Sequence, residues 1–142
     1  GHITLNSFYE IDATPLPTWL SWSITIFTVI ILTNAFNLID GIDGLSGLVS
    51  SLVFSFLGFW FFVAGHFFLA IICCAFLGSV IAFLLYNWQP SKIFMGDTGT
   101  LSIGFALAFL AIQFINLNFQ LPNESAARFH ASISTAVCVL II

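Results

Sequence analysis

Long uncharged apolar runs constrain the fold of this chain more than any other feature of its sequence. Hydrophobic residues make up 60% of the 142 positions and charged residues only 6%, whereas about a quarter of the residues in soluble domains are charged. A helix of about 20 apolar residues crosses the hydrocarbon core of a bilayer. The chain therefore predicts an all-α fold, a polytopic transmembrane helical bundle that forms one domain over residues 1–142. The expected spans are about 19–39, 45–64, 67–86, 101–117 and 129–142.

Charge and cysteine content exclude several classes of partner and site. The formal net charge is −4, and Lys92 and Arg128 are the only lysine and the only arginine. Without a basic patch to neutralise phosphates, no nucleic-acid partner is expected. Cys73, Cys74 and Cys138 lie in apolar runs without the spacing of a metal site or a disulfide framework, so we expect small buried hydrophobic side chains at all three positions.

The first polar segment, residues 34–45, closes the first apolar run and reads NAFNLIDGIDGL. Polar groups next to the hydrocarbon core must be hydrated, paired or functional, because burial without a partner is costly. Asn34, Asn37 and Asp40 follow one another at intervals of three, which places neighbouring members on one face of a helix. The glycines that follow favour a sharp turn and a close approach of backbone to a ligand.

The second polar segment, residues 87–100, reads NWQPSKIFMGDTGT and separates the third and fourth apolar runs. Its proline and glycines predict a shaped loop rather than a helix. Two spans lie between the two polar segments, and an even number of crossings returns the chain to the same membrane face. We therefore expect Asp40, Asp43 and Asp97 to converge at one membrane surface.

Converging carboxylates and amides are typical of a Mg²⁺ site, since this cation prefers oxygen ligands and completes its shell with water and substrate phosphates. A bound cation also lets a diphosphate approach aspartates that would otherwise repel it. The pattern indicates metal-assisted phosphoryl chemistry at a membrane surface. The alternatives are a cation-coupled membrane transporter, an inactive membrane scaffold, and aspartates that merely cap helix ends at a wet interface.

The segments NAFNLIDGIDGLSG and FMGDTGTLSIGF resemble two signature segments of the polyprenyl-phosphate N-acetylhexosamine-1-phosphate transferases, in glycosyl transferase family 4. The resemblance implies a multi-pass enzyme of the bacterial inner membrane whose active site faces the cytoplasm. Such enzymes transfer a sugar 1-phosphate from a UDP-N-acetylhexosamine to undecaprenyl phosphate and release UMP. The implied cofactor is Mg²⁺, with Mn²⁺ as a substitute; membrane lipid is a further partner and a homodimer a candidate assembly.

The resemblance also assigns roles by position. Asp97 matches the metal-binding aspartate of the second segment, and Asp40 and Asp43 match the acidic pair of the first, so these three are the expected catalytic residues. The expected substrate-binding residues are Asn34, Asn37, Asn87, Phe94 and Gly96, of which Asn87 and Phe94 match positions lining the nucleotide pocket. For Asn34 the alternative is a helix-packing hydrogen bond, and for Lys92 the alternatives are a snorkelling interfacial lysine and a phosphate contact.

The choice of sugar is the least constrained of these inferences. Phe36, Ile39, Thr98 and Thr100 resemble the N-acetylglucosamine branch, which serves lipopolysaccharide and teichoic-acid synthesis. The alternative is the peptidoglycan branch, which uses UDP-N-acetylmuramoyl-pentapeptide. The family's upstream aspartate-rich motif and downstream histidine-rich loop do not occur in the sequence. We therefore expect a fragment of a longer protein, inactive as a transferase by itself.

Overall fold

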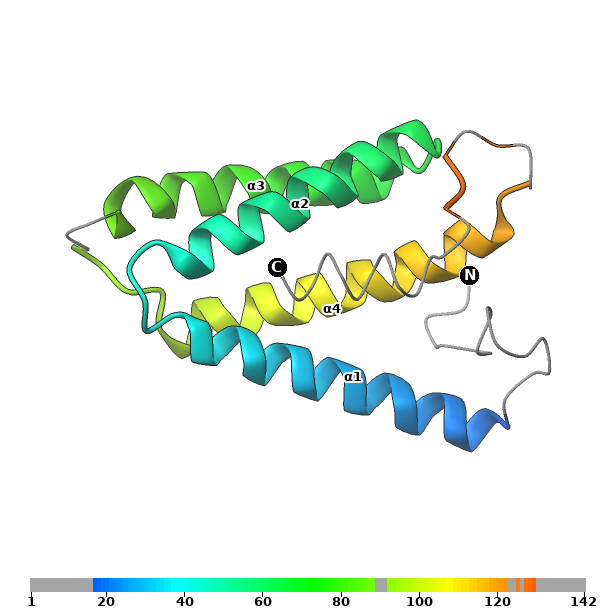
Figure 1. The fold of residues 1–142 in the computed structure, drawn as a ribbon, viewed down its shortest axis with the longest axis horizontal. Helices are drawn as coiled ribbons and strands as arrows, with labels where there is room; N and C mark the ends of the chain where they lie inside the picture. Colours follow the sequence, from blue (N-terminus) through cyan, green and yellow to red (C-terminus); the bar gives the residue numbers. More distant parts are fainter. Residues whose placement is uncertain (1–16, 89–91, 123–124, 126, 130–142) are drawn as a thin grey trace.

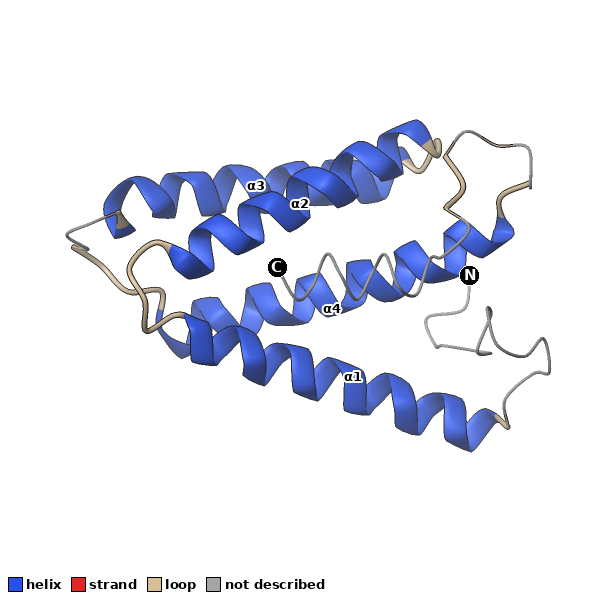
Figure 2. Ribbon diagram, viewed as in Figure 1, coloured by secondary structure: helices blue, strands red, loops and turns tan. Residues whose placement is uncertain are grey.

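The chain folds into antiparallel helices (Figure 1). The computed structural model describes residues 17–88, 92–122, 125 and 127–129. The helices within them are α1 (Thr18–Ile39), α2 (Leu45–Val63), α3 (Phe67–Asn87) and α4 (Gly96–Gln120). Figure 2 shows only helices and loops in this part of the chain, and all four helices are long and apolar enough to cross a membrane. The all-α multi-pass prediction is confirmed; the span expected at 129–142 lies outside the described residues apart from Phe129.

The helix boundaries match the predicted spans closely, with one correction. The fourth helix was expected to begin at Leu101, but α4 begins at Gly96, so the prediction of a loop is wrong for residues 96–100. Asp97 lies in the first turn of α4, where a negative side chain is favoured by the helix dipole. Gly96 has a φ of +69°, a conformation that glycine adopts readily. The glycines here start a helix rather than prevent one.

The helices pack as two close pairs, α1 with α4 and α2 with α3 (Figure 1). Glycines allow the close approach within each pair. A Cβ atom added to Gly104 of α4 would lie 2.9 Å from the Cα of Thr33 in α1, and one added to Gly58 of α2 would lie 3.1 Å from the Cβ of Cys73 in α3. Small residues at such crossings allow van der Waals packing between membrane helices.

A group of aromatic residues joins the two pairs at the end where α2 and α4 finish. The ring of Trp60 in α2 lies edge-on to Phe114 in α4, with centroids 4.6 Å apart. The indole Nε1 of Trp60 donates a hydrogen bond of 2.7 Å to the carbonyl of Ala127. Phe114 is fully buried, so this contact between the pairs belongs to the core.

The cysteine prediction holds for one of the two described cysteines. Cys73 is buried, as expected, whereas Cys74 is exposed on α3 and the expectation for it is wrong. Consecutive residues of a helix point about 100° apart, and only Cys73 faces α2. Cys138 lies outside the described residues.

Candidate functional site

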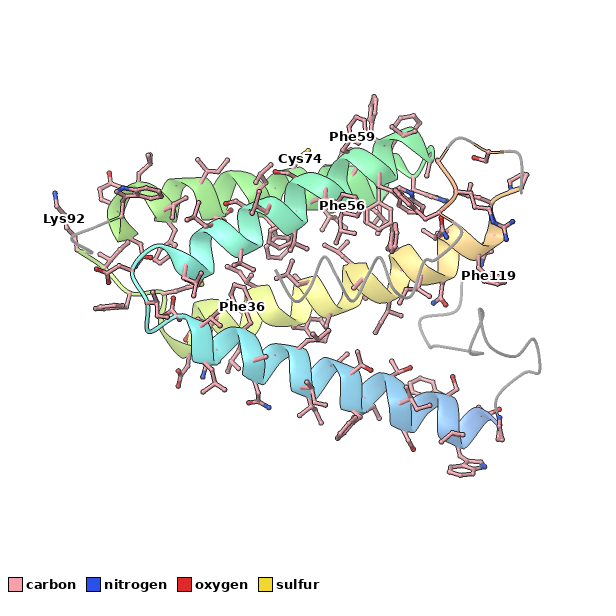
Figure 3. All side chains as sticks on the ribbon, in the orientation of Figure 1. Phe36, Phe56, Phe59, Cys74, Lys92 and Phe119 are labelled. Carbon is pink, nitrogen blue, oxygen red and sulfur yellow. The ribbon has the colours of Figure 1, made fainter. Side chains whose placement is uncertain are left out.

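The two polar segments meet at one end of the bundle, as the topology of the spans predicted. There α1 ends and α2 begins, and α3 ends and α4 begins (Figure 1). We call this the motif end and define it by residues 37–46, 87–88 and 92–100. Figure 3 places Lys92 at the motif end and Phe119 at the opposite end.

Asp40 is a buried link between three helices. It follows the last residue of α1 and is only 8% exposed. Its Oδ1 accepts a hydrogen bond of 2.8 Å from the hydroxyl of Ser46 in α2, and its Oδ2 accepts one of 3.2 Å from the backbone N–H of Gly96 in α4. Burying a carboxylate is costly unless it is hydrogen-bonded, and these two donors meet that need.

Asn87, the last residue of α3, connects the two loops. It is fully buried. Its Oδ1 accepts a hydrogen bond of 2.8 Å from the backbone N–H of Gly44, which precedes α2, and its Nδ2 donates one of 2.7 Å to the carbonyl of Ile93. Gly44 has a φ of +74°, a conformation that a side chain would strain. The amide of Asn87 is thus engaged with the protein on both sides.

A second link joins α1 to α4 one helical turn away from Asp40. The hydroxyl of Thr100 donates a hydrogen bond to Oδ1 of Asn37. Thr100 is fully buried, and Asn37 is half-buried. The structure therefore brings two of the predicted site residues of α1 into direct contact with the start of α4.

The remaining predicted site residues are more open. Asp97 and Phe94 are exposed, Phe94 by 64%, and Asp43 is half-buried in the turn before α2. Asp97 directly follows Gly96, whose N–H is bonded to Asp40. Asn34 does not join this group: it is exposed on α1, and its Nδ2 donates to the carbonyl of Ile30 in its own helix.

Asp40, Asp43 and Asp97, all at the motif end, do not form a ready metal site by themselves. Among the described residues, no group of three or more His, Cys, Asp and Glu side chains comes close enough to hold a metal. Mg²⁺ is commonly bound by one or two carboxylates together with water and substrate phosphates. Asp97 and Asp43 are the two less buried carboxylates of the motif end.

Two buried hydroxyls of the site were not predicted in their roles. The sequence assigns no role to Ser46, and it indicates only a sugar preference for Thr100. A serine or threonine at the start of an apolar run gives no signal of its partner, because these hydroxyls usually bond to their own helix. The turn between α1 and α2 brings Ser46 to Asp40, and the approach of α4 to α1 brings Thr100 to Asn37.

An apolar cavity of about 400 Å³ adjoins the motif end between α1, α2 and α4. Ile39 and Leu45, which flank the turn that carries Asp40 and Asp43, contribute to its wall. Deeper in the membrane the wall continues with Ile31, Ala35, Phe36, Val49, Val53 and Leu107. The polar groups of the motif end thus stand next to an apolar space.

Comparisons with known proteins found a family and several relatives. The family model described as glycosyl transferase family 4 matches residues 1–115. The chain is similar to the phospho-N-acetylmuramoyl-pentapeptide-transferase of Clostridium perfringens, with 49% identity over 80 residues, which is 56% of this chain and 25% of the relative. It is also similar to the protein of that name from Synechococcus elongatus, with 42% identity over 93 residues, which is 66% of this chain and 25% of the relative. The protein of that name from Clostridium kluyveri is 45% identical over 80 residues, which is 56% of this chain and 25% of the relative. The chain spans about a quarter of the length of these relatives. No solved structure matches it.

Proposed function

The chain belongs to glycosyl transferase family 4, and from this membership we propose that it forms part of the active site of a polyprenyl-phosphate sugar-1-phosphate transferase. The enzyme takes the sugar 1-phosphate from a UDP-sugar, passes it to undecaprenyl phosphate and releases UMP. The observation that carries the proposal is the hydrogen bond between Asp40 and the N–H of Gly96. It joins the two signature segments at the residue next to Asp97.

In this proposal Asp97 and Asp43 hold Mg²⁺, which supplies positive charge beside the phosphates of the nucleotide sugar. The exposed ring of Phe94 offers a face on which the uracil stacks. An oxygen of the lipid phosphate attacks the sugar-bearing phosphorus, and the bond from that phosphorus to the UMP oxygen breaks. A phosphate monoester is already anionic near neutral pH, so no side chain of the chain is assigned as a general base.

The acceptor's lipid nature agrees with the position of the site. The motif end lies where the apolar helices leave the membrane, and the apolar cavity beside Ile39 and Leu45 opens next to its polar groups. A phosphate on a long hydrocarbon tail would reach such a place from the bilayer. We place this end of the bundle at the cytoplasmic face of the bacterial inner membrane.

The relatives favour the peptidoglycan branch over the N-acetylglucosamine branch, because those compared are named phospho-N-acetylmuramoyl-pentapeptide-transferases. Two of the four residues that indicated N-acetylglucosamine, Phe36 and Thr100, carry less weight in the structure. Phe36 is buried in the core, and the fully buried Thr100 bonds to Asn37. Their identities reflect packing rather than contact with a sugar. We therefore propose UDP-N-acetylmuramoyl-pentapeptide as the donor and undecaprenyl phosphate as the acceptor.

The placement of charge weighs against a transporter. Among the described residues, Asp40, Asp43, Lys92, Asp97 and Arg128 all lie at helix ends or in connections. Transporters place ionisable groups and broken helices near the bilayer midplane. The interiors of α1 to α4 contain no charged side chain.

The test uses the full-length gene product in detergent or in vesicles. UMP release and lipid product are measured with UDP-N-acetylmuramoyl-pentapeptide and, separately, with UDP-N-acetylglucosamine. We expect turnover of the first donor, its loss when Mg²⁺ is chelated, and its loss in Asp97→Asn with at most a small fall in the unfolding temperature, from the lost helix-dipole interaction. Asp97 is exposed and asparagine has the same shape, so the fold has no reason to fail. Turnover of UDP-N-acetylglucosamine alone would instead establish the other branch, and full activity in Asp97→Asn would refute the proposal.

A further inference from the structure

Two fully buried hydroxyls have no part in the chemistry proposed so far. Ser46 lies in the first turn of α2 and Thr100 at the end of the first turn of α4, and both are 0% exposed. Each donates a hydrogen bond to a polar side chain at the end of α1. The Thr100 hydroxyl also lies 3.1 Å from the carbonyl oxygen of Gly96 and 3.3 Å from that of Asp97 in its own helix, but its contact with Asn37 is the shortest. Ser102 of α4, by contrast, bonds to the carbonyl of Thr98 in its own helix and, among the described residues, to no other helix.

The first bridge runs from Ser46 through Asp40 to Gly96. With its Oδ1 held by Ser46, the carboxylate of Asp40 presents Oδ2 to the N–H of Gly96. A hydrogen bond from a fixed donor favours one orientation of a carboxylate over its other rotamers. The bridge therefore fixes the backbone directly before Asp97.

The second bridge, from Thr100 to Asn37, lies one turn along both helices. Asn37 precedes Asp40 by three residues on α1, and Thr100 follows Asp97 by three on α4. Two polar contacts one turn apart restrict sliding and rotation at this end of α4 more than one contact would. The direction of the Asp97 side chain depends on that rotation.

The helix pair does not need these bridges to stay together. Gly104 already brings α4 against the backbone of Thr33 in α1, and Leu107 and Leu110 of α4 are buried in the core. Apolar packing therefore holds the pair along its length, and the two polar bridges act at the end that carries the carboxylates.

We propose that Ser46 and Thr100 are positioning residues, which hold the first turn of α4 and the Asp97 carboxylate in the orientation that binds the divalent cation. This inference rests on the proposed function. It assigns the two hydroxyls to the metal site without contact to metal or substrate.

The experiment compares variants of the full-length protein. Thr100→Val keeps the branched shape of threonine and removes its hydroxyl. Ser46→Ala removes the hydroxyl of Ser46. Thr100→Ser keeps the hydroxyl and removes only the methyl group. Ser102→Ala is the matched control, because Ser102 is on the same helix and bonds only to its own backbone. Binding of Mn²⁺ is measured by electron paramagnetic resonance, together with the Mg²⁺ concentration for half-maximal UMP release and the unfolding temperature.

We expect Thr100→Val and Ser46→Ala each to weaken Mn²⁺ binding by about tenfold or more, the usual effect of losing a group that orients a metal ligand. The half-saturating Mg²⁺ concentration should rise in parallel. Thr100→Ser should recover most of the affinity, and Ser102→Ala should match the wild type. If the Thr100→Val protein does not fold well enough to be purified, the Mn²⁺ affinity of Ser46→Ala alone tests the proposal.

Two results overturn different claims. Lower unfolding temperatures with unchanged Mn²⁺ affinity would mean that the hydroxyls only stabilise the fold, and the positioning role would be refuted while the proposed function stood. The metal site itself would be refuted if the wild-type protein bound no Mn²⁺, or if Asp97→Asn bound Mn²⁺ as tightly as the wild type does.

Discussion

At the scale of single residues, Asn87 shows how much of the motif end depends on one amide. It donates to the loop that leads to α4 and accepts from the turn that leads to α2. The sequence indicated a polar residue near a nucleotide, and that role stays a prediction. Its two protein partners were not predictable, because they depend on which loops meet at the end of α3.

We predict that Asn87→Leu lowers the free energy of unfolding by about 2 kcal/mol or more. The substitution leaves the buried N–H of Gly44 unpaired, which costs about 1–3 kcal/mol, and it also removes the bond to the carbonyl of the more exposed Ile93. Chemical unfolding of the full-length protein in detergent measures the change. Asn34→Leu is the control, since Asn34 is exposed and bonds only within α1, and we expect a change within about 0.5 kcal/mol. Equal effects at both positions would contradict the assignment.

At the scale of elements, the crossing of α1 and α4 decides where the site residues lie. Gly104 allows the backbones to touch, and one turn nearer the motif end Thr100 reaches Asn37. The early start of α4 was missed because glycine is usually read as a helix breaker. The tertiary bond from Asp40 to Gly96 supports the first turn instead.

We predict that Gly104→Ala lowers the free energy of unfolding by about 1–3 kcal/mol, the usual effect of overpacking. The added Cβ would lie 2.9 Å from the Cα of Thr33, so the helices would have to separate. The matched control is Gly78→Ala on α3, where nothing lies within 4 Å of the added atom and helix propensity favours alanine by about 1 kcal/mol. A Gly104→Ala protein as stable as the wild type would show that the crossing is looser than described.

At the scale of the whole molecule, the order and direction of the helices were readable from the sequence. Apolar length gave the spans at α1 to α3 to within a residue, and counting crossings put the two polar segments at one end. The pairing of α1 with α4 was not readable, because all four helices are apolar on most faces. The contact that joins Asp40 to Gly96 follows from that pairing.

The topology can be tested by labelling single cysteines after Cys73, Cys74 and Cys138 have been replaced. We predict that Ile42→Cys and Lys92→Cys, both exposed at the motif end, react with a membrane-impermeant maleimide only in inside-out vesicles. His66→Cys, at the turn between α2 and α3, should react only from the other side of the membrane, in intact cells. In cells with an outer membrane, that membrane is first made permeable to the reagent. Labelling of Ile42→Cys and Lys92→Cys from opposite sides would contradict a shared motif end.

We further predict that the 142-residue chain by itself does not turn over a UDP-sugar. Its described residues contain no cluster of three metal-binding side chains, and the chain spans about a quarter of the length of its relatives. UMP release by the purified chain, compared with the full-length protein under the same conditions, is the measurement. Release at a comparable rate would show that the site is complete within these residues.

The hydrogen bonds between the two signature segments mean that a change in one segment affects the packing of the other. A chimera that takes its first segment from one relative and its second from another would keep both bonds only if Asn37 still faced a hydroxyl at position 100 and the backbone N–H at position 96 still approached Asp40. Recombination points inside α2 or α3 would therefore separate partners, whereas points before α1 would keep them together.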